Sequence, residues 1–212
     1  MSAQAKIYDN GLVHVRGYLD GAAQRALLME IETALAAAPL FQPLMPKTGK
    51  AFSVRMSNCG ALGWVSDRDG GYRYQAVHPQ TGKPWPKIPS LALQAWDALA
   101  AYPVAPEACL INYYDVSARL GLHQDRDEAD LAAPVLSLSL GSSCVFRFGG
   151  NVRGGKTLAL ELASGDAVLL AGRARLAYHG VARIIPGTSS LLPADSRINL
   201  TLRRVTRPVR TA

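Results

Sequence analysis

The feature that most restricts the fold is a series of short apolar segments in the second half of the chain. They are ACLINYY (108–114), PVLSLSL (134–140), CVFRF (144–148), KTLALEL (156–162), DAVLLAG (166–172) and RINLTLRR (197–204). Gly, Pro or Asp separates most of them, and several alternate apolar with polar residues. Short strands with turn signals between them and no long helix predict a β-sandwich, a barrel or a jelly roll.

The first half of the chain is expected to contain two helices. After a short strand at LVHVRGYL, the residues Leu28, Ile31 and Leu35 recur at helical spacing. Ser90 follows a proline and precedes LALQAWDALAAY, so we expect it to cap a second amphipathic helix.

Between these helices, residues 39–89 are rich in Pro, Gly, Ser and Asn. Aromatic residues are spread through this segment among Arg and Lys, namely Trp64, Tyr72, Tyr74 and Trp85. A loop region of this length in a compact protein is usually functional. We therefore expect an N-terminal part, 1–105, and a β half, 106–206, packed as one compact unit.

Composition indicates a cytoplasmic protein that does not enter a membrane. No apolar run approaches the roughly 20 residues that span a bilayer, and the N-terminus lacks the pattern of a secretory signal. The three cysteines, Cys59, Cys109 and Cys144, are scattered and odd in number, so no disulfide framework is expected.

The chain is basic, with a net charge of +7 and a sequence pI near 9.5. A basic surface attracts polyanions at long range, and nucleic acid is the most abundant of these. Charge alone therefore makes nucleic acid a candidate partner without deciding the matter.

The strongest candidate for chemistry is the pair His123 and Asp125. Side chains two apart on an extended strand point the same way, so His-x-Asp is a natural chelate. A third ligand has to come from His14, His78 or His179, and His179 lies in the β half. Two histidines and a carboxylate form the facial triad of non-haem Fe(II) oxygenases. The alternative is a chance His-x-Asp beside a hydrogen-bonded core histidine.

The last predicted strand supports a binding pocket. Its polar residues Arg197, Asn199, Thr201 and Arg203 alternate with Ile198, Leu200 and Leu202, and Asn112 and Tyr114 alternate in the same way. The alternative is a strand at the protein surface, which would show the same alternation of apolar and polar residues. A wall of Asn, Tyr and two Arg suits carboxylates, because the planar guanidinium binds a carboxylate through two hydrogen bonds.

Taken together, these motifs resemble the AlkB family of Fe(II)- and 2-oxoglutarate-dependent dioxygenases, the bacterial members above all. The matching strings are MSNCGALGW, PQTGKPWP, LINYYDVSARLGLHQDRDEADLAAPVLSLSLG, FRFGG, YHG and RINLTLR, in this order. They run from about Pro43 to Arg203, which is most of the chain.

The resemblance implies a double-stranded β-helix, or jelly roll, as catalytic core, with a nucleotide-recognition lid in residues 1–105. It implies that Fe(II) is bound by His123, Asp125 and His179. It also implies a 2-oxoglutarate pocket, in which Arg197 pairs with the distal carboxylate and Asn112, Tyr114, Asn199 and Arg203 line the walls.

The activity implied is oxidative dealkylation of N-alkylated bases such as 1-methyladenine and 3-methylcytosine, using O2 and 2-oxoglutarate. Formaldehyde, succinate and CO2 leave, and the DNA damage is reversed directly. We expect single-stranded DNA as the partner, with double-stranded DNA and RNA as alternatives, and a monomeric enzyme.

The resemblance also points to residues that hold the flipped base. Trp64 is the expected stacking platform, with His179 as the opposite face. Asp127, assisted by Glu128, is expected to accept a hydrogen bond from an exocyclic amine and to favour a cationic base. Tyr72 and Arg153 are expected to contact phosphate and the lesion strand. Each of these has a plain structural alternative, as a core anchor or a surface charge.

Three other functions compete with this one. The same chemistry could act on RNA, a free nucleotide or a methylated protein. A non-enzymatic nucleic-acid module would have no need for three iron ligands together with Arg197 and Arg203. A cupin-like metal protein without 2-oxoglutarate leaves the final strand unexplained.

Overall fold

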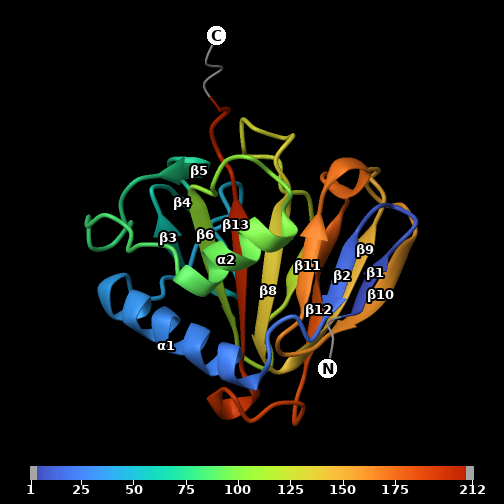
Figure 1. Ribbon diagram of the computed structural model, residues 1–212. Coiled ribbons are helices and arrows are strands. Elements are labelled where there is room, and N and C mark those ends of the chain that lie inside the picture. Colours follow the sequence, from blue (N-terminus) through green and yellow to red (C-terminus); the bar gives the residue numbers. More distant parts are fainter. Residues whose placement is uncertain (1–3, 209–212) are drawn as a thin grey trace.

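The computed structural model describes residues 4–208 and contains two antiparallel sheets that face each other. The strands are β1 (Gln4–Ile7), β2 (Val13–Arg16), β3 (Arg55–Gly60), β4 (Gly63–Asp67), β5 (Gly71–Gln75), β6 (Ala108–Tyr114), β7 (Leu120–His123), β8 (Val135–Gly141), β9 (Ser143–Gly149), β10 (Thr157–Leu162), β11 (Ala167–Leu170), β12 (His179–Ile185) and β13 (Arg197–Arg203). The larger sheet has the order β1-β2-β11-β8-β13-β6-β3, and the smaller has the order β10-β9-β12-β7. This is the predicted jelly roll (Figure 1).

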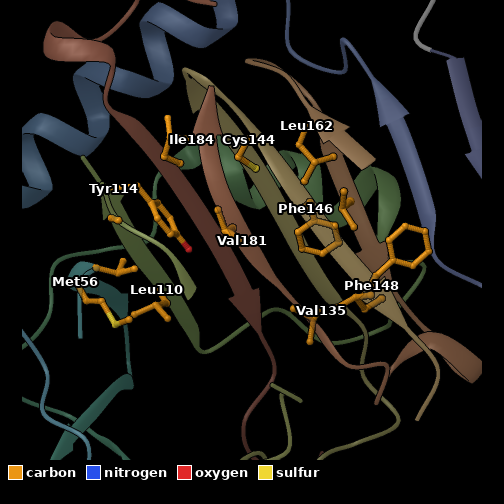
Figure 2. Close-up of a cluster of buried hydrophobic side chains, with 14 of the residues drawn as sticks. Met56, Leu110, Tyr114, Val135, Cys144, Phe146, Phe148, Leu162, Val181 and Ile184 are labelled. Carbon is orange, nitrogen blue, oxygen red and sulfur yellow. The ribbon is translucent and has the colours of Figure 1, made fainter. Parts of the chain in front are cut away.

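The space between the two sheets holds one of the two hydrophobic clusters (Figure 2). Tyr114 and Val135 reach it from the larger sheet, and Phe146, Phe148 and Val181 reach it from the smaller one. Side chains two apart on a strand share a face, so polar residues of the same strands also point into this space. The core between the sheets therefore continues directly into the polar cavity described below.

The second cluster lies on the other face of the larger sheet, under the helices α1 (Gly21–Ala37) and α2 (Ser90–Leu99). Figure 1 shows α2 crossing in front of β6, β13 and β8. Two short 3₁₀ turns, η1 (Gly172–Ala174) and η2 (Pro193–Asp195), complete the elements. Among residues 4–208, no helix is long and apolar enough to cross a membrane.

The predicted helix α1 is confirmed, but its buried stripe is centred one position earlier than expected. Leu27, Ile31 and Ala34 are buried, whereas Leu28 and Leu35 are only half-buried. The 3.6-residue period of the pattern fixes the helix, and packing against the sheet selects which apolar residues face inward.

The predicted cap of α2 is wrong. Ser90 is the first helical residue, Pro89 precedes it as the N-cap, and no side chain of either caps the helix. The carboxylate of Glu30 on α1 accepts hydrogen bonds from the backbone N–H groups of Ser90 and Leu91 instead. An acidic group at a helix N-terminus is favourable, and here it also ties the two helices together.

The segment 39–89 is not one long loop, as its composition had indicated. It contributes β3 to the edge of the larger sheet, beside β6, and it forms the separate hairpin β4–β5. Trp85 is buried, as expected, and packs over Gly63, where a Cβ atom would clash with the indole ring. Glycine at this position therefore lets the hairpin begin directly against the tryptophan.

The position of β13 rules out a surface strand. It lies between β6 and β8 in the centre of the larger sheet, and Arg197, Thr201 and Arg203 are all buried. Strands from the first half join the same sheet, because β3 pairs with β6 and β2 pairs with β11.

Candidate metal centre

The pairing of β7 with β12 places two histidines directly opposite each other. His123 ends β7, His179 begins β12, and their ring centroids are 4.5 Å apart. The strands approach closely at this point, because a Cβ atom on Gly180 would lie 2.5 Å from the carbonyl oxygen of Leu120. Asp125 follows β7 and is buried beside both rings.

Each histidine turns its Nε2 atom toward Asp125. Nδ1 of His123 donates to the carbonyl of Gly121 at 2.9 Å. Nδ1 of His179 donates to the carbonyl of Ala177, also at 2.9 Å. Since a carbonyl only accepts, Nδ1 is the donor in both rings, and in the neutral form of each ring the lone pair is on Nε2. Nε2 of His123 lies 3.7 Å from Oδ1 of Asp125, and Nε2 of His179 lies 3.8 Å from Oδ2.

These three side chains fit a divalent cation. Their ligand atoms lie within 4.8 Å of one another. Oδ2 of Asp125 is buried and has no hydrogen-bond partner among the described residues, which is costly for an anionic oxygen without a cation. Two imidazoles and one carboxylate with further positions open are the donor set of non-haem Fe(II) sites.

The electrostatics keep Asp125 and His179 deprotonated. Burial alone would raise the pKa of Asp125, but the charges of Arg203, His179 and His123 and the hydrogen bond from Arg203 outweigh it and hold this pKa below its usual range. Burial, reinforced by the neighbouring His123, lowers the pKa of His179 to about 4. Metal binding requires deprotonated groups, so at neutral pH these two are ready to bind.

The wall next to the metal residues comes from β13 and β6. Arg197 pairs in register with Tyr114, and Asn199 pairs with Asn112, so the four polar groups form two rows across the sheet. Arg197 donates to Ser139 Oγ at 2.7 Å and to the Ser142 carbonyl at 3.2 Å.

Three buried atoms on these two strands have no hydrogen-bond partner among the described residues, namely Nε of Arg197, Nε of Arg203 and Oδ1 of Asn112. Wall and metal residues line one cavity of about 640 Å³. An unpaired guanidinium N–H in a cavity beside a cation site suits a small dicarboxylate.

An aromatic group stands at the mouth of this cavity. Trp64 stacks on Tyr72 with 5.6 Å between ring centroids, and Phe52 packs edge-on against it. Asn58 fixes the tryptophan, since its side chain exchanges two 3.0 Å hydrogen bonds with the backbone of Trp64. The indole Nε1 donates to Oδ2 of Asp127 at 2.9 Å. Oδ1 of Asp127 makes no hydrogen bond within residues 4–208.

The other two expected substrate residues also line the cavity, in different settings. Glu128 is buried, and both of its oxygens are bonded to protein groups, Tyr74 and Arg175. Arg153 is exposed in the β9–β10 loop, where it borders both the main cavity and a smaller one of about 270 Å³. The structure thus gathers all of the expected site residues around one cavity.

The remaining two histidines have structural surroundings. His14 is fully buried, and its Nε2 lies 2.8 Å from Oδ2 of Asp166. His78 is buried and its Nε2 donates to the carbonyl of Pro39 at 2.8 Å. His179 is therefore the histidine that joins His123 and Asp125.

Comparison with known proteins agrees with this geometry. The model of the 2OG-Fe(II) oxygenase superfamily matches residues 11–203. The chain belongs to the AlkB family of these oxygenases. It is 53% identical over 188 residues to the alpha-ketoglutarate-dependent dioxygenase AlkB homolog of Caulobacter vibrioides, covering 89% of this chain and 84% of that protein.

Two further relatives extend the match over nearly the whole chain. The alpha-ketoglutarate-dependent dioxygenase AlkB of Escherichia coli is 43% identical over 199 residues, which cover 92% of this chain and 90% of that protein. The solved structure of OsALKBH1 superposes with a TM-score of 0.78 at 29% identity, covering 95% of this chain and 100% of that one. This protein is therefore an Fe(II)- and 2-oxoglutarate-dependent dioxygenase.

In this AlkB-family enzyme, the chain supplies preorganised ligands that line one cavity. When bound, Fe(II) and 2-oxoglutarate activate O2 for oxidation of a C–H bond, while 2-oxoglutarate becomes succinate and CO2. The residues available to hold the iron are His123, Asp125 and His179. These three residues would position the iron, and the wall that carries Arg197 borders the same cavity.

Sequence reasoning missed one buried group in the AlkB site, Arg175. Its guanidinium donates to the backbone carbonyl of Asp125 and to the carboxylate of Glu128. In the sequence it is one of several arginines upstream of His179, and no spacing rule separates it from the others. Only the three-dimensional contact reveals it.

Proposed function

We propose that this enzyme removes N-alkyl groups from bases such as 1-methyladenine and 3-methylcytosine in single-stranded DNA. The methyl carbon is hydroxylated, and the N-hydroxymethyl group leaves as formaldehyde. One O2 and one 2-oxoglutarate are consumed for each formaldehyde, succinate and CO2 released. The outcome is direct reversal of the damage, without excision of the base.

The observation that carries this proposal is the aromatic group at the mouth of the metal cavity. A base has to leave its stack to reach the metal, and a base that cannot pair does so at lower cost. Trp64 offers a flat platform for the base. His179 lines the same cavity and would contact the opposite face of the base. The unbonded Oδ1 of Asp127 beside Trp64 suits an exocyclic amine on a positively charged base.

The residue roles follow from the same cavity. We assign Fe(II) to His123, Asp125 and His179. We assign 2-oxoglutarate to Arg197, whose Nε has no partner among the described residues and would bind the distal carboxylate, together with the polar residues Asn112, Tyr114, Asn199 and Arg203. We assign the substrate to Trp64, Tyr72, Asp127, Glu128 and Arg153.

A nucleic-acid substrate is supported by charge and by relatives. The net charge is +7, and the exposed Arg153 at the cavity mouth suits a phosphate. ALKBH1C of Arabidopsis thaliana, 34% identical over 161 residues, is named as a DNA N(6)-methyladenine demethylase. The abh1 protein of Schizosaccharomyces pombe, 41% identical over 83 residues, is named as a tRNA demethylase. RNA is therefore the second candidate substrate.

We further propose that the enzyme acts as a monomer in the cytoplasm.

The test is mass spectrometry of matched DNA and RNA oligonucleotides that each carry one 1-methyladenine. Each is incubated with Fe(II), 2-oxoglutarate and ascorbate in air, beside the variant His123→Ala. We expect the DNA to lose the mass of one CH2 group, only with the natural protein and only with 2-oxoglutarate. Faster conversion of the RNA would establish the second candidate. Succinate release without loss of the methyl group from either oligonucleotide would contradict nucleobase dealkylation.

A further inference from the structure

Arg175 is a buried arginine beneath the metal centre, with 3% of its surface exposed. It follows η1 and stands four residues before His179. Its Nε donates to the carbonyl of Ala133 at 2.6 Å, Nη1 donates to the carbonyl of Asp125 at 2.5 Å, and Nη2 donates to Oε2 of Glu128 at 3.0 Å.

All three hydrogen bonds of this guanidinium go to the segment 125–133. Burying an arginine is costly unless its charge and its N–H groups are paired. Here Glu128 neutralises the charge, and the remaining bonds hold two backbone carbonyls. The planar fork has the geometry to bind all three acceptors at once, which the single ammonium group of a lysine lacks.

Asp125 is thereby fixed from two sides. Arg175 holds its backbone carbonyl, and Nη2 of Arg203 holds Oδ1 of its carboxylate at 2.9 Å. Oδ2 has no hydrogen-bond partner within residues 4–208 and is turned toward Nε2 of His179. Because Arg175 belongs to the segment that leads into His179, it ties the backbone of one metal residue to the chain that carries another.

Glu128 extends this network to the substrate side. Its Oε1 accepts from the hydroxyl of Tyr74 on β5 at 2.5 Å and lies 3.4 Å from Nε of Arg203. The hairpin β4–β5 also carries Trp64 and Tyr72. One buried carboxylate thus contacts the hairpin, the arginine that orients Asp125, and Arg175.

We propose that Arg175 is a positioning residue for the metal centre. It acts through the Asp125 carbonyl and Glu128 to hold Asp125 in its position beside His179. The proposal rests on the Fe(II) chemistry of the family and on the assignment of these residues to the metal. It does not depend on which alkylated substrate is used. Groups that orient metal ligands typically change metal affinity or activity by about 10- to 100-fold when they are removed.

The test measures Mn²⁺ binding by calorimetry, and thermal unfolding of the metal-free protein, for Arg175→Met and Arg175→Lys. We expect the Kd for Mn²⁺ to rise about 10- to 100-fold in the methionine variant. A smaller rise is expected in the lysine variant, which keeps the charge but not the fork. We also measure 2-oxoglutarate turnover at saturating Fe(II) without Mn²⁺. Under these conditions kcat should fall by a smaller factor than the Mn²⁺ affinity does.

Loss of stability needs its own control, because Glu128 is left without a charged partner. Asp166→Asn breaks the buried contact with His14, outside the residues that line the metal cavity. It should lower the melting temperature while leaving the Kd for Mn²⁺ unchanged. Mn²⁺ binding within twofold of the natural protein in folded Arg175→Met would overturn the proposal.

If the methionine variant does not fold, the Kd of the lysine variant for Mn²⁺ is the test. A value within twofold of that of the natural protein would then overturn the proposal. Mn²⁺ binding involves no nucleic acid, so the result stands apart from the outcome of the oligonucleotide test.

Discussion

Arg203 donates to one oxygen of Asp125, Oδ1, at 2.9 Å and leaves the other, Oδ2, without a partner among the described residues. The arginine therefore both neutralises the carboxylate and aims its free oxygen. Because Arg203 is itself buried, it depends on Asp125 and Glu128 for its charge balance.

The variant Asp125→Asn should lose metal binding and also some stability. The amide keeps the shape but removes the negative charge that a divalent ion and Arg203 both require. We expect no measurable Mn²⁺ binding by calorimetry and activity at least 100-fold lower. Breaking a buried ion pair costs about 3–5 kcal/mol when the remaining charge is isolated, and Glu128 should reduce this loss. Undiminished Mn²⁺ affinity would argue against Asp125 as a ligand.

The variant Arg197→Met should raise the KM for 2-oxoglutarate. A hydrogen bond to a charged partner contributes about 1.5–3 kcal/mol, so we expect an increase of roughly 10- to 100-fold. Because the residue does not contact the metal set, the Kd for Mn²⁺ without 2-oxoglutarate should stay the same. Succinate formation at varied 2-oxoglutarate concentration measures the effect. An unchanged KM would exclude Arg197 as the carboxylate partner.

The variant Gly180→Ala tests the close approach of β12 and β7. Its Cβ atom would lie 2.5 Å from the Leu120 carbonyl oxygen, so the strands have to separate and carry His179 away from His123. We expect loss of about 1–3 kcal/mol of unfolding free energy, as for other overpacked positions, together with weaker Mn²⁺ binding. The matched control is Gly121→Ala, where nothing lies within 4 Å of the added atom. Equal stability of the two variants in urea unfolding would contradict this account.

Part of the site was predictable from short-range periodicity, whereas the residue roles came from the resemblance to the AlkB family. His123 and Asp125 share a side by their spacing of two, and the polar residues of the last strand share a face for the same reason. Long-range pairing was not predictable in this way. The place of Arg175 depends on a contact 50 residues away in sequence, with Asp125. The cap of α2 likewise comes from Glu30, 60 residues before Ser90.

The buried contact between His14 and Asp166 should make stability depend on pH. Burial alone would raise the pKa of Asp166, but its bonds from His14, Gly17 and Ala163 outweigh burial and lower it below the ordinary 3.8. A lowered folded-state pKa gives stability that is present above about pH 4 and lost as pH falls further. The free-energy difference between the natural protein and Asp166→Asn should therefore shrink on acidification from pH 6 to pH 3. A constant difference in urea unfolding across this range would exclude such a contribution.

The exposed Arg153 should contribute to nucleic-acid binding through a phosphate contact. Each phosphate contact on a single strand lowers the slope of log K against log salt by about 0.7. We expect Arg153→Ala to weaken binding of a methylated single-stranded oligonucleotide and to make this slope shallower by about that amount. Fluorescence anisotropy at several salt concentrations measures both quantities. The control is Arg183→Ala, which removes the same charge from an exposed position on β12 that lines neither cavity. If both variants change the slope equally, the overall charge of the protein accounts for the effect and Arg153 has no specific contact.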